Sequence, residues 1–358
     1  AFTCYGSMVD NVTGDPTTIL PQEAQTNDLT FISAAGFASG AEDSFWVTDV
    51  DVNNAGSGMM AYEFWWLPRG EDNSQPLVSA GFNQDVGKSV RYANILDEVF
   101  GLDSADAPFG AIALSVSGSD ALSMARIFNQ AETDEGGTFG QALPGVGVGD
   151  LIMEGETRRI IFMSEDDDFR ANLGCQNGTD GNISIGYELF DDAGTSLATG
   201  TMGLAAYSNK QINQIFSSNS PVNGYVDVWS DTAGAAFTCY GSMVDNVTGD
   251  PTTILPQDAQ THDLTFISAA GFASGAGDSF WVTDVDVNNA GTGMMTYSFW
   301  WLPRGEDNSQ PMVSDAFSLD VGRSVRYANI LDEVFGLDSA DAPFGAIALS
   351  ASGSDVLS

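Results

Sequence analysis

The chain has 358 residues, with 49 acidic and 11 basic side chains, a net charge of −38 and 43% apolar residues. A surface this negative repels nucleic acids and anionic lipids, so DNA and RNA are excluded as partners. No segment approaches the about 20 consecutive apolar residues of a membrane span, so we predict no transmembrane segment.

The sequence repeats itself with a period of 235 residues, because residues 236–358 are nearly identical to residues 1–123. Only scattered positions differ, such as Lys88 and Arg323. Near-identical copies share one fold and one environment. The chain therefore covers about one and a half periods, and we expect it to be a segment of a longer array.

The first predicted element is a strand over residues 2–9, followed by a turn in residues 10–16, where Asn, Gly, Asp and Pro cluster. A lone strand cannot form a domain, and its second copy, over residues 237–244, closes one. We therefore interpret residues 1–27 as the last strand and tail of a preceding module, of the type that is named B below.

Short β-branched and aromatic segments separated by turn signals follow from Leu29, which predicts an antiparallel β-sandwich over residues 28–149, named module A. One segment departs from this pattern, because four apolar side chains of residues 92–101 share a helical face: Ile95, Leu96, Val99 and Phe100. Asn94 can cap this helix and Gly101 can end it. We predict a short helix that crosses between the two sheets.

Residues 150–262 repeat the plan of module A with much weaker identity and define module B. The segment FRANLGCQN, residues 169–177, matches FWVTDVDVNN, residues 45–54, and residues 209–218 match the helix. Residues 263–358 form a second module A that lacks its last strand. The predicted fold class is all-β, with tandem Ig-like antiparallel sandwiches that each contain one short crossover helix.

Two explanations for the boundaries of the chain stay open. The chain is either a slice of a continuous polymer, which we favour, or the N-terminal strand of one copy completes the truncated module of the next, as in donor-strand polymers. The copy of that strand at residues 237–244 already lies inside its own module, which supports the first explanation.

Five segments together resemble the tandem Ig-like β-sandwich repeats of large secreted or surface-anchored bacterial proteins that form filaments or stalks: FWVTDVDVNN, FWWLPRGEDN, ILDEVFGL, TFGQALP and MVDNVTGDPTTILP. The resemblance covers the whole chain. It implies an extracellular or cell-surface location and a repeat architecture, and it carries no catalytic residues.

The three cysteines occupy two kinds of position, since Cys4 and Cys239 are the same repeat position. Cys175 and Cys239 lie on two predicted strands of module B, and we predict a disulfide between them, formed in an oxidising compartment. Cys4 is expected to pair outside this segment. The alternative is that all three are buried free thiols. Module A has Val52 and Ser123 at the matching places.

Acidic loops are numerous, and the candidate Ca²⁺ ligands are Asp166, Asp167 and Asp168. Carboxylates clustered at strand ends can ligate Ca²⁺ through six to eight oxygens. No loop has a defined calcium-binding spacing, so the favoured interpretation is solvated turns, with no firm metal site and no other cofactor.

Consecutive tryptophans recur in both copies of module A, as Trp65 and Trp66 and as Trp300 and Trp301. Adjacent strand residues point to opposite faces, so at least one member of each pair lies outside the core. That outer face is an interface between modules, a platform for sugar stacking, or a covered surface. We favour the interface, because a polymer must bury surface between its units.

Four Asn-X-Ser/Thr sequons give candidate glycosylation sites at Asn11, Asn177, Asn182 and Asn246. Such short motifs also arise by chance in a chain rich in Ser and Thr.

Catalysis has little support, because the single histidine, His262, is Asn27 in the first copy, so no repeated function requires it. We therefore expect no enzyme. The leading hypothesis is a structural extracellular polymer of alternating sandwiches, whose partners are other copies of itself by self-association or neighbouring repeats. The rival hypothesis is an adhesin that binds glycan or Ca²⁺ through exposed tryptophans or acidic loops.

Overall fold

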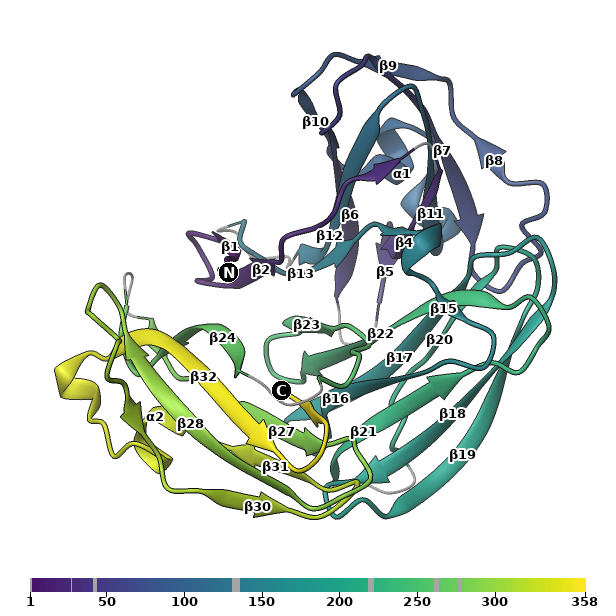
Figure 1. Ribbon diagram of the computed structural model, residues 1–358. Helices are drawn as coiled ribbons and strands as arrows, with labels where there is room; N and C mark the ends of the chain where they lie inside the picture. The colour runs from purple at the N-terminus through teal and green to yellow at the C-terminus, as the bar shows by residue number, and fades with distance from the viewer. Residues whose placement is uncertain are drawn as a thin grey trace.

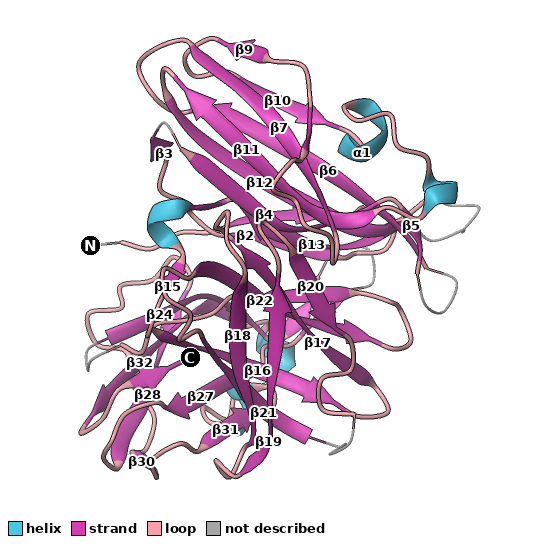
Figure 2. Ribbon diagram, turned by 90° about the vertical axis from the view of Figure 1, so that its right-hand side faces the viewer, coloured by secondary structure: helices cyan, strands magenta, loops and turns pink. Residues whose placement is uncertain are grey.

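The computed structural model describes residues 2–26, 28–40, 44–130, 136–217, 222–260, 264–275 and 279–358. These residues form antiparallel β-sheets that assemble into three sandwiches, with module B between the two copies of module A (Figures 1 and 2). The predicted all-β class is confirmed. In Figure 1 the three sandwiches follow a bent row rather than a straight one. No helix of the described residues is long and apolar enough to cross a membrane.

Module A consists of two facing sheets. The first runs in the order β10 (Ser89–Tyr92), β6 (Phe45–Asn54), β12 (Asp120–Gln130) and β13 (Thr138–Pro144), with β3 (Gln25–Thr26) on β12 and β5 (Ala38–Ser39) on β6. The second runs in the order β14 (Val146–Gly147), β4 (Leu29–Gly36), β11 (Phe109–Ser117), β7 (Met60–Pro68) and β8 (Leu77–Val78), with β9 (Phe82–Gln84) on β7.

The crossover helix of module A is α1 (Ile95–Glu98), which connects β10 of the first sheet to β11 of the second, as predicted. Its Ile95 and Leu96 are fully buried in the core. Asn94 is the N-cap residue but lies in the left-handed region with φ 46°, and its side chain makes no capping hydrogen bond. Gly101, with φ 64°, ends the turn in a conformation that favours glycine. The short helices η1 (Ser104–Asp106) and η2 (Val148–Asp150) complete the module.

Module B is a complete sandwich within residues 152–254. One sheet runs in the order β15 (Ile152–Met153), β22 (Ala236–Asp245), β17 (Phe169–Asn177) and β20 (Asn209–Ile212), with β23 (Pro251–Ile254) on β22. The other runs in the order β16 (Thr157–Glu165), β21 (Val222–Trp229), β18 (Ile183–Asp191) and β19 (Ser196–Leu204). Its core is a cluster of buried residues drawn only from Ile152 to Ile254. Module B therefore contains the parts of an independently folding unit.

The predicted helix of module B is wrong for its described residues, which carry strand β20 and then turns up to Ser217. Two backbone N–H groups that a helix would use have other partners. The N–H of Ile215 donates to the carbonyl of Ala171 at 2.8 Å, and the N–H of Phe216 donates to a carboxylate oxygen of Glu165 at 3.1 Å. These bonds hold the segment against the strands, with Phe216 fully buried.

The second module A repeats the first. One sheet runs β24 (Leu264–Gly271), β32 (Phe344–Ser352), β28 (Met295–Pro303) and β29 (Met312–Val313), with β30 (Phe317–Leu319) on β28. The other runs β31 (Ser324–Tyr327), β27 (Val285–Asn289) and β33 (Val356–Leu357), and β25 (Ala273–Ser274) pairs with β26 (Phe280–Trp281). Helices α2 (Ile330–Glu333) and η3 (Ser339–Asp341) match α1 and η1.

The N-terminal segment forms a hairpin of β1 (Gly6–Val9) and β2 (Pro16–Ile19). Its pairing of Gly6 with Ile19 is the same register as the pairing of Gly241 with Ile254 between β22 and β23 in module B. The hairpin thus reproduces the end of module B. The assignment of residues 1–27 to a preceding module, and the boundaries of the other modules, stay predictions.

Candidate inter-module interfaces

Module A meets module B through an apolar face, which we name the A–B junction. Five residues of module A form this face on the outer side of the second sheet: Phe31, Trp65, Leu67, Ala111 and Ala113. All but Trp65 are fully buried, and Trp65 is half-buried. Module B covers the face with Leu151, Tyr207 and Ala236. Burial of so much apolar surface stabilises a fixed contact between the two sandwiches.

Tyr207 is the central side chain of the junction. It lies in the loop between β19 and β20, with its ring centroid 6.3 Å from that of Phe31 and 6.0 Å from that of Trp65. The Trp65 ring is nearly perpendicular to it, at 80°, which is a favourable edge-to-face geometry. Burial raises the pKa of the Tyr207 hydroxyl, so the side chain stays neutral.

Hydrogen bonds from two backbone N–H groups and two asparagine side chains fix the alignment of the two modules across this apolar contact. The N–H of Gly70 donates to the carbonyl of Asn209, and the N–H of Asn73 donates to the carbonyl of Ala206, both at 2.9 Å. The Nδ2 of Asn209 donates to the carbonyl of Leu67 at 2.9 Å, and the Nδ2 of Asn73 donates to the carbonyl of Tyr207 at 3.1 Å. Asn73 is 3% exposed, so loss of these partners would leave buried polar groups unpaired.

A second part of the junction joins β13 of module A to β22 and β23 of module B. The Oε1 of Gln141 accepts from the hydroxyls of Ser242 at 3.1 Å and Thr253 at 3.0 Å. Tyr240 of β22 is 2% exposed and belongs to the core cluster of module A, and its hydroxyl donates to Gln211 at 2.7 Å. Tyr240 of module B therefore completes the core of module A, which a flexible linker would not allow.

Module B meets the second module A through polar contacts beside a small apolar cluster of Ile161, Tyr225 and Leu357, and we name this contact the B–A junction. Arg159 binds Asp227 of its own module with two bonds of 2.6 and 2.7 Å and donates to Asn288 of the next module at 2.8 Å. Its guanidinium also lies 4.1 Å above the ring of Tyr225. The hydroxyl of Tyr225 donates to the carbonyl of Gly322 at 2.7 Å. This guanidinium is pre-oriented by its own module to bind the next.

Arg326 makes the reciprocal contact from the second module A. It pairs with Asp286 at 3.2 Å, lies 4.1 Å above the ring of Phe162, and donates to the hydroxyl of Ser164. Burial raises the pKa of Asp286 to about 6, although the charge of Arg326 opposes that shift. At the matching place in the first module A, Arg91 and Asp51 form an exposed pair, because no module covers them in this chain.

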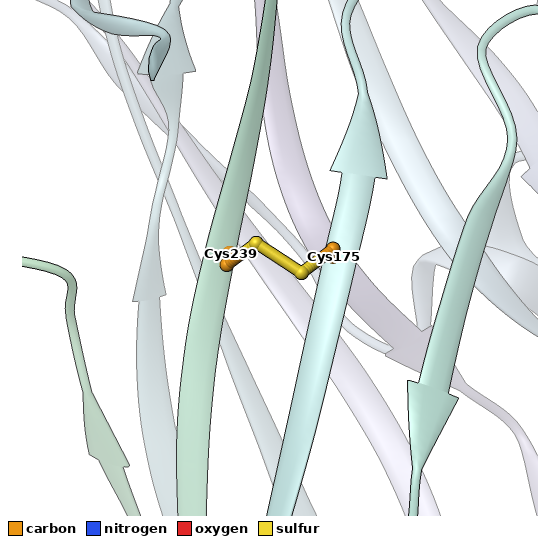
Figure 3. The surroundings of a disulfide bond; sticks show 2 residues. All are labelled: Cys175 and Cys239. Carbon is orange, nitrogen blue, oxygen red and sulfur yellow. A yellow bond between two sulfur atoms is a disulfide. The ribbon is translucent and has the colours of Figure 1, made fainter. Parts of the chain in front are cut away.

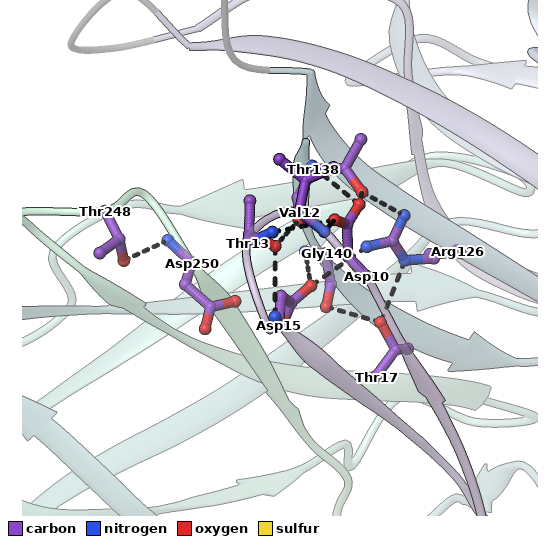
Figure 4. Close-up of polar contacts among 10 residues, drawn as sticks. All are labelled: Asp10, Val12, Thr13, Asp15, Thr17, Arg126, Thr138, Gly140, Thr248 and Asp250. Carbon is purple, nitrogen blue, oxygen red and sulfur yellow. Dashed lines mark hydrogen bonds and ion pairs between the residues drawn. The ribbon is translucent and has the colours of Figure 1, made fainter. Parts of the chain in front are cut away.

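The two copies of the DNVTGDP turn lie close together around β13 (Figure 4). The carboxylate of Asp15 accepts from Arg126 at 3.1 Å and from the N–H of Gly140 at 2.8 Å. Asp250 is the same repeat position as Asp15 and lies beside it. Burial, and then the charge of Asp15, raise the pKa of Asp250 to about 7. Successive turns of the repeat therefore meet at two buried carboxyls whose pKa values are both raised by burial.

The predicted disulfide between Cys175 and Cys239 is present (Figure 3). The two residues face each other on β17 and β22, the neighbouring central strands of their sheet. Val52 and Ser123 face each other in the same way on β6 and β12, which confirms the correspondence between the two modules. Cys4 is an exposed free thiol, and its pairing outside the segment stays a prediction.

The tryptophan pairs divide as strand alternation predicts. Trp66 and Trp301 are each 4% exposed and lie in the cores of their modules, whereas Trp65 lies in the A–B junction. Trp300 lies on the matching outer face of the second module A and is half-buried. The structure thus places Trp65 in contact with a neighbouring module.

The candidate Ca²⁺ ligands lie in a tight turn between β16 and β17. The carboxylate of Asp166 accepts from the N–H groups of Asp168 and Phe169, at 2.9 and 2.8 Å. The carbonyl of Asp167 accepts from Asn246 at 3.2 Å. Among the described residues, no group of three or more acidic, histidine or cysteine side chains could hold a metal ion.

The sequon asparagines differ in exposure. Asn11 and Asn182 are exposed, and Asn246 is half-buried. Asn177 is fully buried, and its Nδ2 donates to the carbonyls of Gly181 and Ala205, each at 2.7 Å. Glycosylation at these positions stays a prediction. His262 and Asn27 lie outside the described residues.

Sequence reasoning did not identify the polar residues of the two junctions, among them Asn73, Tyr207, Asn209, Arg159 and Arg326. One available signal was the scarcity of cations, since only 11 basic residues face 49 acidic ones. Three arginines make contacts between modules or between repeats: Arg126, Arg159 and Arg326. In so acidic a chain, each arginine is a candidate contact residue.

No protein-family model matches the chain, and no curated protein matches it either. Among solved structures, a weak likeness is found to a tetra-tandem repeat in the extending region of a large adhesion protein. It has 13% sequence identity, covers 90% of this chain and 71% of that one, and has a TM-score of 0.14. A score this low establishes no common fold and carries no argument about function.

Proposed function

We propose that this chain is a structural segment of an extracellular, filament- or stalk-forming repeat protein, in which alternating A and B sandwiches are held in a fixed orientation. The observation that carries the proposal is the A–B junction, where Tyr207 packs on Phe31 and Trp65 while Asn73 and Asn209 fix the register. Flexible tandem modules do not require such a buried and hydrogen-bonded contact.

The proposed location outside the cell is supported by the disulfide between Cys175 and Cys239, since such bonds persist in oxidising compartments. The net charge of −38 would keep neighbouring fibres soluble and apart. The proposed partners are neighbouring repeats. The proposal assigns no catalytic role, because the single histidine, His262, is Asn27 in the first copy.

The rival function, a glycan-binding adhesin with a tryptophan platform, has weaker support. Trp66 and Trp301 are in the module cores, and Trp65 packs against Tyr207. A sugar would have to displace module B to reach Trp65. We therefore favour a structural role over glycan binding for these three tryptophans. Trp300 lies half-buried on the matching outer face of the second module A, which module B does not cover.

Negative-stain electron microscopy of the chain tests the proposed function. We expect one dominant particle shape, a bent row of three lobes, because both junctions fix the angle between neighbours. The Tyr207→Asp variant places a charge in the A–B junction and should produce particles with variable angles at one joint only. A wide range of shapes in the unmodified chain would refute the proposal.

A further inference from the structure

On the second module A, module B does not cover the face that the first module A buries against it. The N-terminal segment approaches the same sheet, where Thr3 Oγ1 lies 3.3 Å from Ser268 Oγ on β24. The five residues of that face recur unchanged, as Phe266, Trp300, Leu302, Ala346 and Ala348. Phe31 is 0% exposed, whereas Phe266 is 47% exposed. In Figure 1 the sheet of β24, β32 and β28 lies on the side of its module away from module B.

The polar half of the interface is also repeated and open. Gly305 and Asn308 match Gly70 and Asn73, and within the described part of the chain neither of their backbone N–H groups has a backbone acceptor. Asn308 keeps the bond from its Nδ2 to its own Pro303 carbonyl, at 3.1 Å, as Asn73 does with Pro68. The donors are therefore held in position for carbonyls like those of Ala206, Tyr207 and Asn209.

We infer that this open face is a docking site for a further B-type sandwich, which binds it as module B binds the first module A. The inference rests on the proposed function and names the partner. The occupant is defined by complementary chemistry: a tyrosine at the place of Tyr207, an asparagine at the place of Asn209, and a loop with three outward carbonyls. Identical apolar and donor groups on both copies require the same partner surface.

Module B of a second copy of this chain is not the occupant. Its Tyr207 and Asn209 are already engaged by Trp65 and Leu67 of its own module A. A second copy would therefore have to open its own A–B junction before it could bind. A B-type sandwich with a free docking surface has no such cost.

The test extends the full chain so that the 235-residue period continues after Ser358. One version appends residues 124–260, which completes the second module A and adds a B-type sandwich. The control version appends residues 124–150 alone, which completes the second module A without adding module B. A third version carries Tyr207→Asp in the appended copy only.

The measurement is amide hydrogen exchange of the loop that contains Gly305 and Asn308. The matching amides of the first module A, Gly70 and Asn73, donate hydrogen bonds to module B and should exchange slowly. The two loops share the sequence RGEDNSQP but are distinguished by mass at the next residue, Leu77 or Met312. We expect the longer extension to slow exchange in the second loop by ~10-fold or more, towards the rate of the first loop. With the short extension, or with the extension that carries Tyr207→Asp, exchange in the second loop should stay fast.

The outcomes separate the inference from the proposed function. If the second loop stays fast in the longest chain while the loop at Gly70 and Asn73 is slow, the docking inference is wrong and the proposed function stands. If both loops exchange equally fast in the unextended chain, the proposed function itself fails. Protection of the second loop that rises with the concentration of unextended chain would overturn the inference in favour of a second copy.

Discussion

Tyr207 of module B lies edge-on to Trp65 of module A, with ring centroids 6.0 Å apart. We expect Tyr207→Ala to weaken the A–B junction by about 2 kcal/mol, because it removes most of the aromatic contact between the sandwiches. Calorimetry should then resolve separate unfolding of the modules. Tyr5→Ala is the control, since Tyr5 is 47% exposed and its loss should leave the profile unchanged. A merged transition in the Tyr207 variant would contradict this role.

The B–A junction offers a comparison between matched positions. Arg326→Leu should destabilise the chain by about 3 kcal/mol, because it leaves Asp286, 4% exposed in its side chain, as an unpaired buried charge. Arg91→Leu changes the same repeat position in the first module A, where the pair with Asp51 is exposed, and should cost less than about 1 kcal/mol. Urea denaturation of the two variants measures the difference, and equal effects would argue against a buried junction.

The carboxyl pair predicts a dependence of stability on pH. The pKa of Asp250 is raised from 3.8 to about 7 in the folded chain, chiefly by burial. A raised pKa gives a contribution to stability that is full below about pH 3.8 and is lost as the pH rises through about 7. Stability should therefore fall between about pH 4 and about pH 7 and level off above that. Asp250→Asn should flatten this slope and be more stable than the native chain at pH 8.

Urea denaturation at several pH values checks this slope. Asp97→Asn is the control, because Asp97 is exposed and belongs to α1, which lies well away from β2 and β23 in Figure 1. Asp10 affects stability in a different pH range. Burial raises its pKa, but hydrogen bonds from Thr138 and nearby N–H groups outweigh that effect and lower the pKa to about 2. Its contribution is lost only as the pH falls from about 4 towards 2. An unchanged slope in Asp250→Asn would show that the pKa of Asp250 is not raised in the folded chain.

The disulfide should stabilise module B selectively. It closes a loop with a sequence separation of 64 residues, so its reduction should cost about 4 kcal/mol in the chain-entropy model. Replacement of both Cys175 and Cys239 by Ala should lower the unfolding transition of module B, while Cys4→Ser changes nothing because Cys4 is exposed. Amide hydrogen exchange measured separately for each module tests this prediction. An equal loss of protection in both copies of module A would contradict a selective effect on module B.

Much of the fold was predictable because it depends on local pattern. Strand alternation separated Trp65 from Trp66, and the alignment of weakly similar modules identified Cys175 and Cys239 as neighbours. The helix of module B was predicted wrongly, because its alignment with module A did not reveal that Ala171 and Glu165 bind the backbone there. Such contacts depend on strands distant in the sequence.

The contacts between modules were less accessible to sequence reasoning. Asn73 and Asn209 donate to backbone carbonyl groups of another sandwich. Every residue has such a carbonyl, so the side-chain pattern of the sequence does not indicate which ones accept. The pairing of Asp15 with Asp250 requires two repeats to fold against each other. The near-identity of the copies predicted that surfaces would be reused, but it did not identify those surfaces.

The fixed orientation of the sandwiches is tested most directly by the distance between the two copies of module A. Spin labels at Ala105→Cys and Ala340→Cys, in a Cys4→Ser background, occupy matching exposed positions. Pulsed electron spin resonance should give one narrow distance distribution, which broadens when Tyr207→Asp and Arg326→Leu are combined. A broad distribution in the chain without junction variants would mean that the sandwiches are flexibly linked, and would contradict the proposed structural role.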